Sequence, residues 1–201
     1  MKRYLIIVVI LLLAGASTMN AQKVGLKTNA IYMATTTPNL GLEVALDDRW
    51  TLEIEGGYNP WTFDVANNVK AKHYLVSPEL RYWFCEAFNG HFIGVNANYT
   101  QFNLGGVHVL NAFYPTESKG IFLDEALNSR IEGWAAGAGL TYGYAYPISR
   151  RWNMELTLGV GYWYTEYDKY ETKVCGLFQE SGIKQVFGPT SLGISFIYLI
   201  K

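Results

Sequence analysis

The sequence has almost no excess charge of either sign. Its 201 residues include 16 lysines and arginines against 17 aspartates and glutamates, for a formal net charge of −1. Such a balance creates no strong field over the surface, which excludes nucleic acid or a polybasic segment as an electrostatic partner. The length corresponds to about one domain.

Long apolar runs are absent beyond the first residues. No later segment approaches the roughly 20 apolar residues of a membrane-spanning helix. The start of the chain, two positive residues before the apolar run Leu5–Leu13 and then small residues, is typical of a secretory signal peptide. We expect cleavage after Ala21, which gives a signal peptide over residues 1–21 and a mature domain over residues 22–201. An exported chain without a spanning helix is either soluble or a β-barrel.

The sequence is rich in aromatic residues and glycine, and its apolar and polar residues alternate. Aromatic residues make up 15% of the chain, and 20 residues are glycine, a composition that suits strands and turns. Alternation of apolar and polar residues with a period of two recurs through the mature sequence and predicts eight strands. The predicted strands are Val24–Met33, Asn39–Leu46, Trp50–Tyr58, Lys72–Phe84, His91–Phe102, Glu132–Tyr146, Trp152–Tyr164 and Thr190–Ile200.

Short and long links alternate between the predicted strands, apart from the first link, Ala34–Pro38. The short links are Asp47–Arg49, Cys85–Gly90 and Pro147–Arg151, and the long ones are Asn59–Ala71, Asn103–Ile131 and Thr165–Pro189. Outer-membrane barrels have this arrangement, and aromatic residues at both ends of the strands match their interfacial girdles. Pro78 lies within a strand, where we expect a bulge.

The predicted fold class is therefore all-β, an eight-stranded antiparallel transmembrane β-barrel with short periplasmic turns and longer outer loops. Its expected location is the outer membrane of a Gram-negative cell, after signal-peptide export. A soluble β-sandwich or a lipocalin-like barrel would also alternate, but neither needs aromatic belts at both ends of its strands.

Several short runs resemble a known family. They are VGLKTN (24–29), PNLGLE (38–43), GGYNPW (56–61), SPELRYW (77–83), NGHF (89–92), GY (143–144), RWN (151–153) and GPT (188–190). In this order they resemble a family of small outer-membrane barrels from Bacteroides-type bacteria, domain of unknown function 3575. The resemblance implies an eight-stranded outer-membrane barrel. It implies no activity and carries over no catalytic residues.

Charged residues recur on the inward faces of the predicted strands. They form an expected interior polar cluster of Lys27, Glu43, Glu53, Glu55, Glu79, Arg81 and Glu155. An eight-stranded barrel is just wide enough inside for its side chains, so buried charges there must pair. Arg81 can bind carboxylates with two parallel hydrogen bonds, and Glu43 and Glu155 are the expected partners. The cluster is either a structural plug or a gated path for protons or ions.

The residue types of a lipid hydrolase are present but are spaced too widely. His73, Ser77 and Glu79 share a face of one strand, yet a rise of about 3.3 Å per residue puts His73 and Ser77 about 13 Å apart. They cannot form a hydrogen bond, and we expect no enzyme activity. Isolated histidines also lack metal-ligand spacing, so no cofactor or metal is expected. Cys85 and Cys175 fall at opposite ends of the predicted barrel, too far apart for a disulfide.

The longest link, Asn103–Ile131, is the candidate for recognition. It contains more large apolar residues than a disordered loop would, so we expect partial order and a short helix over Leu123–Asn128. The candidate outer-loop contacts are Phe113, Tyr114 and Phe122.

The expected function is a non-enzymatic outer-membrane barrel with a surface-binding or structural role. Its expected partners are outer-membrane lipid and a surface protein or glycan. The alternatives are a small ion channel or transporter and, after that, a lipid-modifying outer-membrane enzyme.

Overall fold

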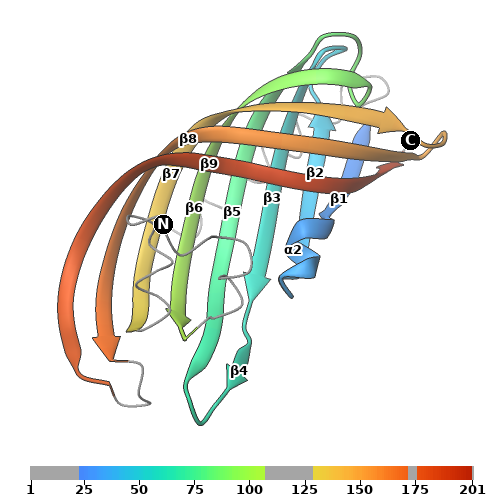
Figure 1. Cartoon of the computed structure of the whole chain (residues 1–201). Coiled ribbons are helices and arrows are strands. Elements are labelled where there is room, and N and C mark those ends of the chain that lie inside the picture. The colour runs from blue at the N-terminus through green and yellow to red at the C-terminus, as the bar shows by residue number, and fades with distance from the viewer. Residues whose placement is uncertain (1–22, 107–128, 172–175, 201) are drawn as a thin grey trace, which may run out of the picture.

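A computed structural model describes residues 23–106, 129–171 and 176–200 (Figure 1). The described chain is all-β, as predicted, with one short helix. Its elements are β1 (Val24–Asn29), α2 (Ala30–Ala34), β2 (Asn39–Ala45), β3 (Trp50–Asn59), β4 (Thr62–Asp64), β5 (Val69–Trp83), β6 (Gly90–Gly105), β7 (Ser129–Pro147), β8 (Trp152–Glu171) and β9 (Phe178–Ile200).

The nine strands form a single antiparallel sheet that closes into a ring. Its order is β3-β2-β1-β9-β8-β7-β6-β5-β4, and an additional pairing joins β3 to β5. The ring therefore contains eight strands, and β4 is a short addition to the end of β5. The links β2–β3, β5–β6 and β7–β8 lie at one end of the ring, here called the turn end. The other end, which carries the β4–β5 and β8–β9 hairpins, is the far end.

The wall of the ring alternates between buried polar and exposed apolar side chains. On β3, Thr51 and Glu53 are buried, whereas Leu52 and Ile54 are 39% and 51% exposed. Successive residues of a strand point to opposite faces, so the polar residues point into the ring and the apolar ones outward. Leu140, 66% exposed on β7, shows how apolar the outer face is.

The first predicted strand, Val24–Met33, is too long. The structure ends β1 at Asn29 and places α2 directly after it. The Asn29 side chain accepts a hydrogen bond from the backbone N–H of Ile31 at 3.0 Å. This is the N-cap interaction that begins a helix, and period-two alternation gives no sign of it.

The predicted long link Thr165–Pro189 is wrong, because β8 continues to Glu171 and β9 begins at Phe178. The cause is a bulge. Gly159 pairs with Ser191 and Val160 pairs with Pro189, which leaves Thr190 as an extra residue in β9. A bulge changes which residues of a strand face inward, so the alternation that starts at Thr190 does not continue toward Phe178.

The other two predicted long links are also shorter in the structure, because the strands beside them extend further. Strand β5 begins at Val69, and β4 pairs with its first residues across a tight turn. Strands β6 and β7 extend to Gly105 and from Ser129, so only the middle of the predicted third loop separates them. The strands of the far end are therefore longer than their alternation suggests.

The bulge expected at Pro78 is also wrong. Val76 pairs with Tyr99 and Glu79 pairs with Asn96, which is the same register on both sides of the proline. Pro78 itself pairs with Ile54 on the β3 side. The missing N–H therefore removes ladder pairs toward β6 without shifting the strand.

The ring is complete at the turn end and less complete at the far end. Strand β1 pairs only with Ser195–Ile200 of β9, although β9 begins 17 residues earlier, at Phe178. Helix α2 contacts β9 beyond the end of β1. Figure 1 shows β9 arching away from β1 and α2 toward the far end. In the described part of the chain, no helix is long and apolar enough to cross a membrane.

Candidate functional site

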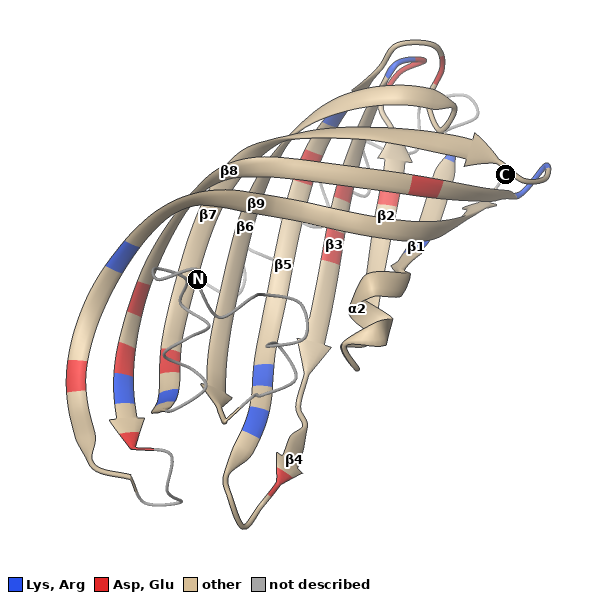
Figure 2. Cartoon of the chain, in the orientation of Figure 1, with Lys and Arg blue, Asp and Glu red and all other residues tan. Residues whose placement is uncertain are grey.

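Inward-facing charged residues from five strands meet at one level of the ring. The sheet register aligns three glutamates across β2, β3 and β5, since Glu43 pairs with Glu53 and Glu53 pairs with Glu79. Figure 2 shows acidic bands on these neighbouring strands inside the ring. Lys27 comes from β1, Arg81 from β5 and Glu155 from β8.

Arg81 lies at the centre of this cluster and is 2% exposed. Its Nε donates to Glu79 Oε1 at 3.0 Å, and its Nη1 donates to Glu43 Oε2 at 2.9 Å. The same Nη1 lies 3.2 Å from Glu155 Oε2, and Nη2 forms an ion pair with Glu53. One guanidinium thus binds four carboxylates, and its planar fork of donors makes this geometry available.

Lys27 supplies the second positive charge. Its Nζ lies 3.1 Å from Glu53 Oε1 and forms a second ion pair with Glu155. Glu43 is bound on its other side by the Thr51 hydroxyl, which donates to Oε1 at 2.6 Å. Buried charges are costly unless paired and hydrogen-bonded, and these residues bind one another in a single network.

Glu55 lies at the margin of the cluster, two residues toward the far end from Glu53. It is half-buried, and its buried Oε1 has no hydrogen-bond partner within the described residues. The structure therefore brings Lys27, Arg81 and four of the glutamates into contact and leaves Glu55 beside them. Two cations face four bound carboxylates, so the cluster carries an excess of acidic groups.

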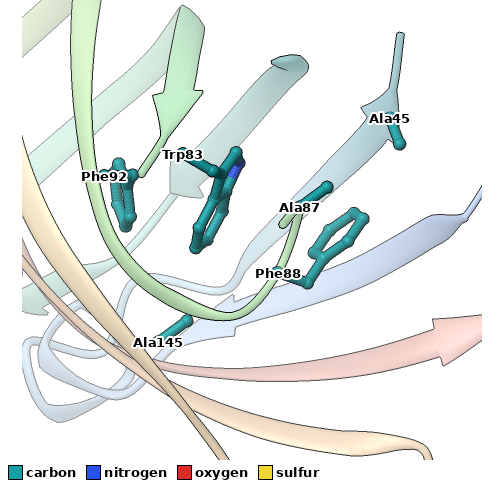
Figure 3. Close-up of a cluster of buried hydrophobic side chains, with 6 residues drawn as sticks. All are labelled: Ala45, Trp83, Ala87, Phe88, Phe92 and Ala145. Carbon is teal, nitrogen blue, oxygen red and sulfur yellow. The ribbon is translucent and has the colours of Figure 1, made fainter. Parts of the chain in front are cut away.

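An apolar plug lies between the charged cluster and the turn end. Figure 3 shows its side chains, which are Ala45, Trp83, Ala87, Phe88, Phe92 and Ala145. Trp83 and Phe92 are in ring contact with centroids 4.6 Å apart. The Arg81 guanidinium lies 4.5 Å from the Phe92 ring centroid, a cation–π contact that joins the plug to the charged cluster.

The β5–β6 turn folds into the ring to complete this plug. Ala87 N–H donates to the Asp48 carbonyl at 2.7 Å, and Asn153 Nδ2 donates to the Phe88 carbonyl at 2.6 Å. Phe88 is 2% exposed and adopts a positive φ of 67°. The sequence predicted only a short link here, Cys85–Gly90. The available signal was the apolar pair Ala87 and Phe88 inside a short link.

A neutral polar layer occupies the ring on the far side of the charged cluster. Asn96 Nδ2 donates to Thr141 Oγ1 at 2.6 Å, and Asn98 Nδ2 donates to Asn96 Oδ1 at 2.9 Å. An added Cβ at Gly139 would lie 2.3 Å from Thr190 Oγ1, so glycine is required for these side chains to fit. From the turn end, apolar, charged and neutral polar layers thus fill successive levels of the ring.

Two of the candidate hydrolytic residues, His73 and Glu79, bind other partners in the structure. The Glu79 carboxylate binds Arg81, while His73 contacts the Ala71 carbonyl at 2.9 Å and Thr37 Oγ1 at 3.5 Å. Within residues 23–106, 129–171 and 176–200, no group of three or more His, Cys, Asp or Glu side chains is placed to hold a metal ion. Cys85 is free and exposed at the turn end.

Several predicted features lie outside the described residues. They are the signal peptide over residues 1–21, Cys175, the expected helix Leu123–Asn128 and the contacts Phe113, Tyr114 and Phe122.

The far end has an apolar groove that the sequence analysis missed. Its volume is about 550 Å³, and its lining residues are Met33, Thr36, Pro38, Trp61, Thr62 and Phe63. Trp61 Nε1 donates to the Thr36 carbonyl at 2.9 Å, which fixes β4 against the segment after α2. The signal was the aromatic pair Trp61 and Phe63 in a link that was expected to be irregular.

The β4–β5 turn beside the groove is held by Asp64. Its carboxylate accepts from Ala66 N–H at 2.8 Å and from the Asn67 side chain at 2.7 Å. These hydrogen bonds lower the pKa of Asp64 below its ordinary value. The turn is therefore shaped by its own side chains.

Comparison with known proteins identifies the family. No match was found among curated proteins. A family model described as "Protein of unknown function (DUF3575)" matches residues 7–200, nearly the whole chain. The short sequence runs therefore identified the family correctly, and the chain belongs to the DUF3575 family.

Proposed function

We propose that this protein is a closed outer-membrane β-barrel that conducts no ions, catalyses no reaction and acts through its outer end. In this proposal the turn end faces the periplasm and the far end faces outward. Short periplasmic turns and longer outer connections are the rule for such barrels.

The outward face of the ring supports insertion into a membrane. Val95, Leu140 and Leu158 are 60%, 66% and 58% exposed near the middle of their strands. Monomeric soluble proteins rarely expose continuous apolar surface of this extent. Lipid would cover these side chains, and antiparallel pairing joins each of the eight strands of the ring to both neighbours, which a bilayer favours.

Aromatic residues on the outward face gather at two levels, which also supports insertion into a membrane. Toward the turn end, Trp50 packs on Tyr82 and Trp152 packs on Tyr198, each pair with centroids 5.1 Å apart. Toward the far end, a continuous row crosses four strands and contains Tyr74, Tyr99, Trp134 and Tyr164, with successive centroids 6.3, 6.2 and 5.6 Å apart. Two such belts are expected at the two interfaces of a bilayer.

The sealed interior is the observation that carries the assignment of a closed barrel. Arg81, Glu43 and Glu155 are at most 2% exposed, and Trp83 and Phe92 are fully buried beneath them. A continuous water path would have to pass both the ion-paired layer and the aromatic plug. A structural role for the interior leaves the exposed aromatic groove and the outer loops as the parts available to a surface protein or glycan.

A gated proton or ion path is the second candidate, and the excess of carboxylates over cations favours it. Electrical recording in planar bilayers distinguishes the two. We expect the refolded protein to give no single-channel steps at voltages where a porin control conducts. Reproducible steps that disappear in Glu55→Gln would instead support the ion path.

A further inference from the structure

Three cations form a patch on the outward face of the far end. Cross-strand pairs place Lys70 opposite Gly105 and Gly105 opposite Arg130. The next pairs toward the turn end run from Lys72 to Asn103 and from Asn103 to Glu132. Figure 2 shows two basic bands at the far end of β5 and one at the far end of β7.

The patch lies directly beyond the outer aromatic row. The pairs below it join Tyr74 to Gln101 and Gln101 to Trp134, and both aromatic residues belong to that row. Lys72 is two residues from Tyr74 on the same face of β5, about 7 Å along the strand. If the aromatic row marks the edge of the hydrocarbon, as the proposed function requires, these cations lie at the level of lipid headgroups.

Gly105, which lies between Lys70 and Arg130 in the cross-strand row, leaves room for the stem of Arg130. An added Cβ there would lie 3.5 Å from Arg130 Cγ and 3.1 Å from the Asn68 carbonyl. The Arg130 stem thus passes beside Gly105, and its guanidinium lies over the Tyr170 ring of β8, on the other side of β7.

The positive charge of the patch is only partly neutralised. Glu132 lies 3.9 Å from Arg130 Nη2 and already accepts a hydrogen bond from Asn103 at 2.9 Å. Within the described residues, Lys70 and Lys72 form no ion pair. Arg130 Nε is buried without a hydrogen-bond partner there, while its guanidinium lies 4.2 Å from the Tyr170 ring centroid. The two ammonium groups and the exposed part of the Arg130 side chain, 18% of its surface, remain available to an anion.

We infer that Lys70, Lys72 and Arg130 bind the phosphate of a lipid headgroup in the outer leaflet. Phosphate accepts hydrogen bonds from a guanidinium and is attracted by ammonium groups, and the lipid chains would run down the wall past Tyr74 and Trp134. The inference rests on the proposed membrane insertion and adds a ligand class to it.

Native mass spectrometry of the refolded protein in maltoside micelles tests the site. Dioleoyl phosphatidate is added at a fixed ratio, and bound lipid is counted for the wild type and for K70Q/K72Q. We expect lipid occupancy to fall about fivefold per lysine removed, the effect of one cation near an anionic lipid surface. Arg130→Gln, which removes the fork of donors, should weaken binding as well.

A matched control removes the same charge from the opposite face of the wall at the same end. Lys169 pairs with Glu180 at 3.7 Å, and Lys184 lies 5.6 Å from the Tyr167 ring centroid on the inward side. K169Q/K184Q should bind phosphatidate like the wild type. Equal loss in both double variants, or none in K70Q/K72Q, overturns the site.

Inorganic phosphate distinguishes a lipid site from a phosphate site. A tenfold excess of inorganic phosphate over lipid should leave phosphatidate bound, because the chains add contacts that free phosphate lacks. Complete displacement would show a site for free phosphate and overturn the lipid assignment. Every variant must also show a boiling-dependent shift on denaturing gels. Recovery of the wild type as a soluble monomer without detergent would overturn the proposed function itself, and the lipid ligand with it.

Discussion

The two ends of the ring are built differently from the same alternating strands. At the turn end, eight strands are paired in a closed circle around a filled interior, and Lys27, Glu43 and Glu155 are at most 3% exposed. At the far end, β1 stops at Asn29 while β8 continues to Glu171, and Phe187 of β9 is 74% exposed. We therefore propose that stability resides at the turn end and recognition at the far end.

The largest expected effect is in the charged cluster. Arg81→Leu leaves four carboxylates without their common partner and should reduce the free energy of unfolding by about 3–5 kcal/mol, the usual cost of breaking a buried ion pair. Urea titration of the refolded protein in detergent micelles measures the loss. Leu80→Ala is the control. Leu80 is the neighbouring residue on the outward face of β5, and its truncation should cost far less because lipid or detergent fills the gap. Equal small losses would mean that the assignment of inward and outward faces on β5 is wrong by one residue.

A smaller loss is expected in the apolar plug. An added methyl at Gly143 would lie 2.3 Å from Phe92 Cζ, so Gly143→Ala must displace a packed ring and should cost about 1–3 kcal/mol. Gly56→Ala is matched in chemistry, since its Cβ would find only backbone oxygens at 3.8 Å or beyond. The same urea titration compares them. If Gly56→Ala is as destabilising as Gly143→Ala, the plug is not tightly packed around Phe92.

These two predictions concern the part of the fold that the sequence predicts well. Alternation on β3 separates Glu53 from Leu52 and Ile54, so the inward charges can be assigned from spacing alone. The partners of each charge cannot be assigned from spacing. Arg81 reaches Glu155, 74 positions away in the sequence, only because the ring closes and brings β5 and β8 to face one another.

The far end is less predictable because its deviations depend on single residues. Thr190 shifts the alternation of β9 by one position, and Asn29 converts the end of a strand into the start of a helix. A single residue also departs from the pattern at the turn end, where Phe88 enters the interior through a positive φ that its residue type rarely adopts. Each deviation depends on the tertiary contacts of one residue, and a pattern averaged over many residues does not reveal it.

Loss of the α2 cap should have a modest effect confined to the far end. Asn29→Ala removes the hydrogen bond to Ile31 N–H and a second one from Asn29 Nδ2 to the Leu192 carbonyl at 3.1 Å. The expected loss is about 1 kcal/mol, typical of an N-cap substitution. Hydrogen exchange followed by mass spectrometry should show faster exchange in α2 and in the neighbouring part of β9. Asn29→Asp preserves the acceptor for Ile31 N–H but loses the bond to the Leu192 carbonyl, so it separates the cap from the second hydrogen bond. Uniformly faster exchange around the ring would mean that the two ends do not unfold separately.

The smallest effect on stability, and the largest on recognition, is expected from the third outer loop. Replacing residues 107–128 with a short Gly/Ser linker removes Phe113, Tyr114 and Phe122 but leaves β6 and β7 paired from Gly105 and Arg130 onward. The described ladder pairs between β6 and β7 lie outside this segment, so unfolding in urea should barely shift. Binding of whole cells to a panel of surface proteins and glycans should fall relative to cells that display the intact protein. Replacing the Trp61 and Phe63 side chains with alanine in the intact protein tests whether the groove contributes to the same binding. Should the loop deletion prevent membrane assembly, the loop belongs to the scaffold, and the division between a stabilising turn end and a recognising far end fails.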